Sequence, residues 1–276
     1  MTAAIIGCGR MGREHAEAYV EMGVPISAVY DLDFYKAQSF AQEFGCEVSS
    51  DIVDKVRADF VSICSWDDAH ASQIIRSKNC RVIAEKPICI EPSDLHRLAS
   101  VNGLTCNLPL RWVDIDPLKP YHVEAQYLWG RADQLTGWRA ACPGYSFVLG
   151  GGVHVADLIC RRGRPLFVSA HGQATHGFPA PTMIVATGQY DDGRTFGISI
   201  NCANIGSHEF HLTEWLPRGR REQRGSGTDK RETIRKVVRG EKIDDPAGLA
   251  AHALCFAIEA ALKNRRVEQV IYPTEA

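Results

Sequence analysis

The 276-residue sequence has no large excess of charge of either sign and no apolar run long enough to span a bilayer. A formal net charge of −2 excludes a general electrostatic attraction to nucleic acid or to a membrane surface. The longest apolar helix, expected near 249–262, contains His252 and Glu259 and is too short for a membrane span. No basic leader precedes the apolar run that starts at Ala3, so we expect no signal peptide.

Closely paired cysteines are also absent, although ten cysteines are present. None forms a Cys-x-x-Cys pair, and several of them, such as Cys64, Cys106 and Cys255, lie inside apolar segments. Neither zinc-type spacing nor the framework of a secreted disulfide-rich domain is recognisable. We therefore expect reduced thiols, a cytoplasmic location and no metal site.

The first hundred residues alternate between short apolar strands and helices. Asp33 and Ser93 are the expected N-caps of two of these helices. Repeated βα units predict a parallel sheet covered by helices on both faces, and we assign 1–110 to a doubly wound α/β domain. The expected strands are 3–6, 26–30, 60–64, 81–84 and 105–108.

The pattern changes after about residue 110. Longer stretches alternate with the period of a strand, and Asp191-Asp192-Gly193 is a hairpin turn signal. A helix is expected over about 246–263. We therefore predict an α+β domain over 111–276 with an open, mostly antiparallel sheet. Its expected strands are 121–128, 167–176, 183–190, 196–201 and 208–216.

A glycine-rich turn, Gly7-Cys8-Gly9-Arg10-Met11-Gly12, follows the first strand and opens the first helix. Such glycines permit a tight turn and let the backbone approach a pyrophosphate at the helix N-terminus. Asp31 ends the second strand, 19 residues beyond Gly12, where a carboxylate binds ribose hydroxyls and repels a 2′-phosphate. We expect NAD rather than NADP. A glycine turn of purely structural use is the alternative.

Two further elements contain groups suited to proton transfer. Lys86, within Glu85-Lys86-Pro87, ends a buried strand, and ligands of parallel sheets bind beyond that edge. A partly desolvated lysine there donates to a substrate hydroxyl or relays its proton. The glycines at 150–152 lead into a helix with His154, which accepts a proton from a carbinol as hydride leaves. The plainer alternatives are a solvated lysine and a half-buried helix histidine.

In this order the elements resemble the Gfo/Idh/MocA family, which includes glucose–fructose oxidoreductase and inositol dehydrogenase. The resemblance implies a Rossmann domain, then an open antiparallel sheet that often serves for dimerisation. It also implies hydride transfer between nicotinamide and a sugar, polyol or related carbinol. It is based on Gly7, Gly9, Gly12, Asp31, Ser65 with His70, Glu85-Lys86-Pro87, Asn107 with Arg111, and Gly152-Val153-His154-x-x-Asp157.

The family pattern implies three sets of site residues, a sugar-like substrate and a homodimer or higher homo-oligomer. Lys86 and His154 are the expected catalytic residues, and we expect them to converge on one substrate oxygen. The expected cofactor-binding residues are Gly7, Gly9, Arg10, Met11, Gly12, Asp31, Ser65, Trp66, His70, Glu85 and Lys86. The expected substrate-binding residues are Asn107, Arg111, Trp138, Arg139 and Asp157.

Several positions depart from the family pattern. Gly150 stands four residues before His154, where relatives commonly have an aspartate that positions the acid–base group. Cys64-Ser65-Trp66 replaces a common threonine-proline pair, and the connection 111–121 is short. Two other functions therefore stay open. One is a non-catalytic dinucleotide-binding sensor or regulatory protein, and the other is a glycoside-cleaving enzyme that uses tightly held NAD.

A basic stretch over 218–242 contains ten Lys/Arg against four Asp/Glu. It lacks the interleaved aromatic residues or recognised module of a nucleic-acid-binding surface. We expect a solvated loop and helix, with a phosphate-bearing sugar substrate as the alternative.

Overall fold

The computed structural model describes residues 1–50, 58–130, 146–174, 181–202, 207–226, 229–245 and 247–273. Its internal contacts divide the chain into two units. Unit 1 comprises Met1–Leu108 and Asp229–Gly248, and unit 2 comprises Pro109–Thr228 and Leu249–Ala276. The first boundary lies close to the one expected at 110. Residues 229–248, however, belong to unit 1, whereas the sequence pattern placed them in the second domain.

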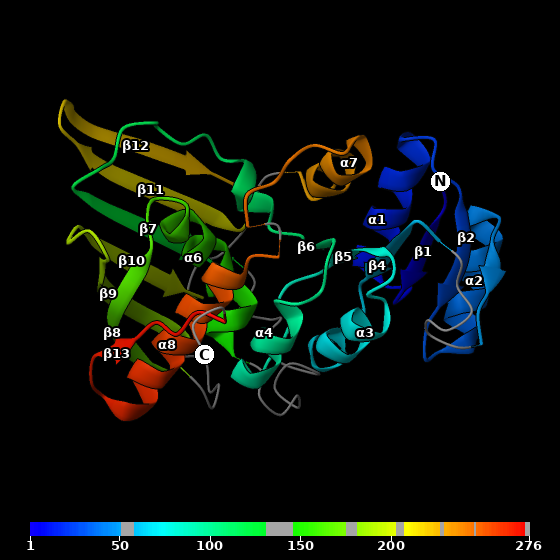
Figure 1. Ribbon diagram of the computed structural model, residues 1–276, viewed down its shortest axis with the longest axis horizontal. Helices are drawn as coiled ribbons and strands as arrows, with labels where there is room; N and C mark the ends of the chain where they lie inside the picture. The colour runs from blue at the N-terminus through cyan, green and yellow to red at the C-terminus, as the bar shows by residue number, and fades with distance from the viewer. Residues whose placement is uncertain are drawn as a thin grey trace. The chain divides into compact units, whose positions relative to one another are not determined.

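Unit 1 is built on a six-stranded parallel sheet (Figure 1). The strand order is β3-β2-β1-β4-β5-β6, which is that of a doubly wound Rossmann sheet, so the expected fold of this domain is confirmed. Helices cover both faces, so β1 and β4 are fully buried and read as continuous apolar runs. The strands are β1 Ala3–Ile6, β2 Ile26–Tyr30, β3 Glu47–Val48, β4 Phe60–Ile63, β5 Arg81–Ala84 and β6 Leu104–Cys106. The helices are α1 Arg10–Glu21, α2 Phe34–Phe44, α3 His70–Arg76, α4 Pro92–Leu98 and α7 Glu232–Arg239, with a 3₁₀ turn at Asp67–Ala69.

Local capping explains where two of these helices begin. The side chain of Asp33 accepts from the amide of Lys36 at 3.2 Å, as expected of the α2 N-cap. Ser93 does not cap α4, because that helix begins at Pro92 and its N-cap is Glu91. Proline fits the first helical position, since its fixed φ is already helical and its missing N–H would have no partner there.

Unit 2 contains a seven-stranded sheet in the order β12-β11-β7-β10-β9-β8-β13. Neighbouring strands are antiparallel except for the parallel pair β7 and β10, so the expectation of a mostly antiparallel sheet is confirmed. The β9–β10 hairpin turns at the predicted position, with Gly193 at φ 85°. The strands are β7 His122–Leu128, β8 Pro165–Gln173, β9 Met183–Tyr190, β10 Thr195–Asn201, β11 Glu209–Leu216, β12 Gly219–Gly225 and β13 Glu268–Gln269.

One face of this second sheet is covered and the other is open. Helices α6 (Val153–Cys160) and α8 (Leu249–Asn264) pack on the covered face (Figure 1). On β9, Ile184 and Ala186 point to the covered face and are buried, whereas Val185 is 57% exposed. The open face also carries Phe167 on the neighbouring strand.

Nine cysteines lie within the described ranges, and all nine are free thiols. Among the helices described, none has the length and apolar character needed to cross a membrane.

Candidate functional site

The three glycines of the amino-terminal turn have different roles. Gly7 has φ 94°, and a Cβ there would lie 2.5 Å from the carbonyl carbon of Cys64. A Cβ on Gly12 would lie 2.1 Å from the oxygen of Gly7, so both positions require glycine. At Gly9 the nearest atom to such a Cβ is the Lys36 Nζ, 3.8 Å away. The open space at Gly9, at the start of α1, fits the close approach of a dinucleotide pyrophosphate.

Asp31 lies at the carboxyl end of β2, directly beside this turn. Its carboxylate accepts from the amide of Cys8 at 2.8 Å and from the amide of Asp33 at 3.0 Å. The ammonium of Lys36 is 3.6 Å away. The carboxylate is therefore fixed beside the glycine-rich turn, with a cation next to it. Arg10, predicted to contact the cofactor, is exposed at the start of α1, and Met11 is partly buried.

The loops after β4 and β5 are tied together by His70. Its two ring nitrogens face the carbonyl oxygens of Pro87 at 2.6 Å and Ser65 at 3.1 Å. The Ser65 hydroxyl donates to Gln73 Oε1 at 2.6 Å, whereas the Trp66 side chain is 61% exposed. His70 is buried, so the structure gives it an interior role in fixing two loops at the carboxyl edge of the sheet.

A buried polar cluster includes Glu85, the residue that precedes Lys86. We call this cluster the hub, and it consists of His15, Glu85 and Asn107. The Asn107 amide donates to Glu85 Oε1 at 2.8 Å, and His15 Nε2 lies 3.1 Å from the same oxygen. On its other side, His15 Nδ1 lies 2.9 Å from the hydroxyl of Ser62. The sequence predicted Glu85 and Asn107 as ligand-binding residues, whereas the structure directs both side chains into the interior of unit 1. His15 was missed, and its position on the buried face of α1 was the available signal.

The hub holds the Glu85 carboxylate in its charged form. Burial alone would raise the pKa of Glu85, but the hydrogen bond and charge of His15, with smaller effects of Lys86 and Asn107, lower that pKa to about 2. A carboxylate that stays ionised at neutral pH therefore precedes Lys86 in the chain.

In unit 2, small residues bring the start of α6 close to the sheet. A π-helical turn, Val148–Gly152, leads into α6. A Cβ on Gly152 would lie 2.4 Å from the Ile200 side chain, and one on Gly151 would lie 3.5 Å from the Tyr127 ring. His154 is 8% exposed, and its ring centroid lies 5.4 Å from that of Tyr127. The glycine run thus places His154 against the end of β7.

More rings gather at this end of the sheet. The Tyr127 ring stacks with His208 at a centroid distance of 6.0 Å, and Trp129 lies 5.9 Å from His208. Trp129 also stacks on Phe147 at 4.9 Å. This ring cluster was not predicted from the sequence. The sequence feature that could have indicated it is the pair Tyr127 and Trp129, two aromatic residues spaced by two at the end of a strand, a spacing that places both on the same face of the sheet.

Arg111 and Asp157 form a buried ion pair within unit 2. Arg111 Nη2 donates to Asp157 Oδ1 at 2.6 Å, and the two residues are 5% and 2% exposed. Asp157 is therefore engaged by Arg111. The other predicted substrate residues, Trp138 and Arg139, lie outside the described residues.

Comparison with known proteins identifies the first domain. Residues 1–102 match the model of the oxidoreductase family with an NAD-binding Rossmann fold, Gfo/Idh/MocA. The amino-terminal domain belongs to this family. The match confirms the resemblance inferred from the sequence motifs over residues 1–102.

Similar proteins include inositol dehydrogenases. The chain is 36% identical over 95 residues to an inositol 2-dehydrogenase of Rubrobacter xylanophilus, a match that spans 32% of this chain and 27% of that relative. Among solved structures, myo-inositol 2-dehydrogenase of Lactobacillus plantarum has a TM-score of 0.84 at 15% identity, covering 98% of this chain and 99% of its own. Scyllo-inositol dehydrogenase of Lactobacillus casei with bound NAD(H) and scyllo-inositol has a TM-score of 0.82 at 15% identity, with coverage of 98% and 99%. At these identities the structures share the fold of both units.

The lowered pKa of Glu85 predicts how stability depends on pH. The unfolded carboxyl takes up a proton near its ordinary pKa of 4.5, and the folded one only near 2. Its contribution to stability is therefore complete above pH 4.5 and is lost as the pH falls towards 2. In this window the free energy of unfolding of the wild type should fall by up to about 1.4 kcal/mol per pH unit more than that of Glu85→Gln. Urea titrations at several pH values measure both, and parallel curves would contradict the hub's assigned charge.

Proposed function

We propose that the protein is an NAD-dependent oxidoreductase that transfers hydride between nicotinamide and the hydroxyl-bearing carbon of a sugar or polyol. The observation that carries this proposal is the open space at Gly9 beside the fixed Asp31 carboxylate, in a domain of an NAD-binding family. The substrate class is supported by relatives named as inositol dehydrogenases.

Lys86 and His154 are the proposed catalytic residues. Bound NAD supplies the hydride acceptor. Lys86, just beyond β5, donates a hydrogen bond to the substrate oxygen, and His154 accepts the hydroxyl proton. Gly150 supplies no carboxylate to orient His154, and Asp157 is engaged by Arg111. We infer that packing against Tyr127 orients the imidazole instead.

The half-buried rings of Tyr127 and His208, backed by the buried Trp129, form the proposed substrate-binding surface of unit 2. Such surfaces combine apolar ring faces with a few polar tips that fix orientation. A polyol ring offers C–H groups to the ring faces and hydroxyls to the tips. The cluster lies next to His154, where the proton is to be accepted.

Removing either proposed catalytic side chain should lower the turnover of the enzyme without changing its affinity for the cofactor. Lys86→Ala and His154→Ala should each lower turnover by roughly a hundredfold or more, because general acid–base groups contribute about that much. NADH affinity should change little in both variants, and exposed Lys78→Ala is the matched control. The assay follows NADH formation over a panel of cyclic polyols and sugars.

Each other outcome of that assay counts against the proposal. Full turnover in both variants would contradict the catalytic assignment. NADH binding without turnover of any panel member by the wild type would favour the regulatory function. Cofactor retained through glycoside cleavage, with no net NADH, would favour the glycoside-cleaving alternative.

The cofactor preference is proposed to follow from Asp31. A 2′-phosphate would lie against this carboxylate, so NADH should raise the melting temperature more than NADPH does. Asp31→Ala should narrow the difference between the melting-temperature increases caused by NADH and NADPH. Lys36→Ala should widen this difference, because Lys36 is the cation beside the Asp31 carboxylate and would attract a 2′-phosphate. Exposed Asp59→Ala serves as the control. Equal or greater stabilisation of the wild type by NADPH would contradict the assignment.

A homodimer formed through the open face of unit 2 is the proposed assembly. Phe167, Met183 and Val185 are 40%, 38% and 57% exposed on that face. Burying such apolar side chains against a second copy favours association. Light scattering at micromolar concentration should give the mass of two chains, and Val185→Lys should lower it. A monomer at all concentrations tested would reject this assembly.

The proposed compartment is a reducing cytoplasm. Free thiols persist where thiol reductants keep cysteines reduced, and nine of the ten cysteines are seen as free thiols.

A further inference from the structure

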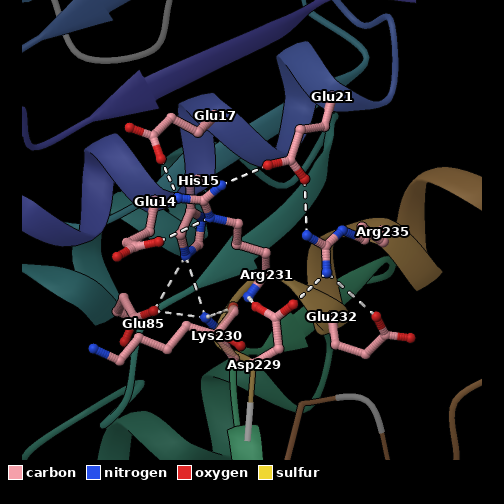
Figure 2. Close-up of polar contacts among 11 residues, drawn as sticks. Glu14, His15, Glu17, Glu21, Glu85, Asp229, Lys230, Arg231, Glu232 and Arg235 are labelled. Atoms are coloured by element: carbon pink, nitrogen blue, oxygen red, sulfur yellow. Dashed lines mark hydrogen bonds and ion pairs between the residues drawn. The ribbon is translucent and has the colours of Figure 1, made fainter.

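Residues 229–241 return to unit 1 after the strands of unit 2 and dock on α1 (Figure 2). Arg231 makes the main contacts. Its guanidinium donates to Glu14 at 2.9 Å, to Glu21 at 2.5 Å and to Glu17. These three glutamates share one stripe of α1, because they are spaced by three and four residues. One arginine thus pairs with three carboxylates along two turns of the helix.

The helix that follows strengthens the docking. Arg235 of α7 donates to Glu21 at 2.8 Å and also pairs with Asp229. Ile234 is fully buried in the core of unit 1, with Val237 and Val238 packed against that core. The basic stretch thus contains the expected helix, but these arginines are held in ion pairs with α1 rather than lying on a solvated face. A single exposed ion pair contributes little to stability, whereas a network of ion pairs around the buried side chain of Ile234 fixes the position of the segment.

Lys230 is held by the hub through its main chain. Its carbonyl oxygen accepts from Asn107 Nδ2 at 3.0 Å, and the same amide nitrogen donates to Glu85 at 2.8 Å. Glu85 directly precedes Lys86. One buried amide therefore fixes the backbone at Lys230 relative to the end of β5, while the neighbouring Arg231 holds the segment on α1.

The side chain of Lys230 is directed past Glu85, away from α7 (Figure 2). It is half-buried, and burial lowers its pKa, with the charges of Arg10 and Lys86 acting in the same direction against Glu14 and Glu85. Lys86 directly follows Glu85, and Arg10 lies one helical turn before Glu14, so each of the two carboxylates that act on Lys230 adjoins a further cationic residue. The two nearby carboxylates already have partners, since Glu85 belongs to the hub and Glu14 pairs with Arg231.

A group of cations whose neighbouring carboxylates are already paired is suited to bind an anion. Arg10 is the first residue of α1, and Gly9, with open space beside it, directly precedes it as the N-cap. We propose that Lys230 is a cofactor-binding residue that, together with Arg10, binds the pyrophosphate of the dinucleotide. This inference rests on the proposed function. It adds to the cofactor site a residue from outside the 1–102 family match.

The test compares NADH with ADP-ribose, which has the pyrophosphate but lacks nicotinamide. Lys230→Gln should lower the binding affinity for both ligands by about tenfold, as expected for the loss of one charge-assisted hydrogen bond. Lys230→Arg should retain most of the affinity. Lys242→Gln, a change at an exposed lysine of the same basic stretch, should leave both dissociation constants unchanged. Isothermal titration measures them, and unchanged thermal unfolding shows that the variants are folded.

The outcomes separate this inference from the proposed function. If the wild type binds neither NADH nor ADP-ribose, the proposed function itself fails. If the wild type binds both and Lys230→Gln binds them equally well, the assignment of Lys230 is overturned. It is also overturned if the variant raises only the KM of a carboxylated or phosphorylated sugar, because the anion would then belong to the substrate.

Discussion

The rest of the site depends on one interaction, the pairing of the buried Glu85 carboxylate with His15 and Asn107 inside unit 1. An unpaired carboxylate at that depth would be strongly unfavourable, so its partners must be in place for β5 to end as it does. Those partners come from α1, from the end of β6 and, through Asn107, from the main chain at Lys230. The hub thus ties together, in one buried cluster, α1, the end of β5 next to Lys86 and the main chain at Lys230.

The two units contribute different chemistry. Unit 1 has the glycine-rich turn, the fixed carboxylate of Asp31 and several cationic residues, which in the proposed function bind a charged dinucleotide. Unit 2 supplies rings and an imidazole, which suit an uncharged polyol with one proton to lose. Its glycine run brings α6 within contact of β7 and β10, so His154 lies against Tyr127. Gly150 stands four residues before this histidine, where relatives commonly have an aspartate, and we propose that packing against Tyr127 helps to orient the imidazole.

Features encoded by short stretches of sequence were predictable. Five of the six strands of unit 1, the glycine-rich turn, the Asp33 cap and the β9–β10 hairpin each depend on neighbouring residues, whereas the two-residue strand β3 was not predicted. Features that depend on tertiary contacts were not. Nothing in the local pattern of 229–241 shows that Arg231 pairs with glutamates more than two hundred positions earlier. Asn107 was found as a candidate, but its partners, Glu85 and the carbonyl of Lys230, come from distant segments.

The central claim is that the hub positions the cations that bind the cofactor, and a double-mutant cycle on NADH affinity tests it most directly. Glu85→Gln, Lys230→Gln and the double variant are compared with the wild type by titration. Loss of the Glu85 charge should loosen Asn107 and with it the main chain at Lys230. The double variant should therefore lose less affinity than the product of the two single losses. A loss equal to that product would show that the two residues act independently, and would contradict the account.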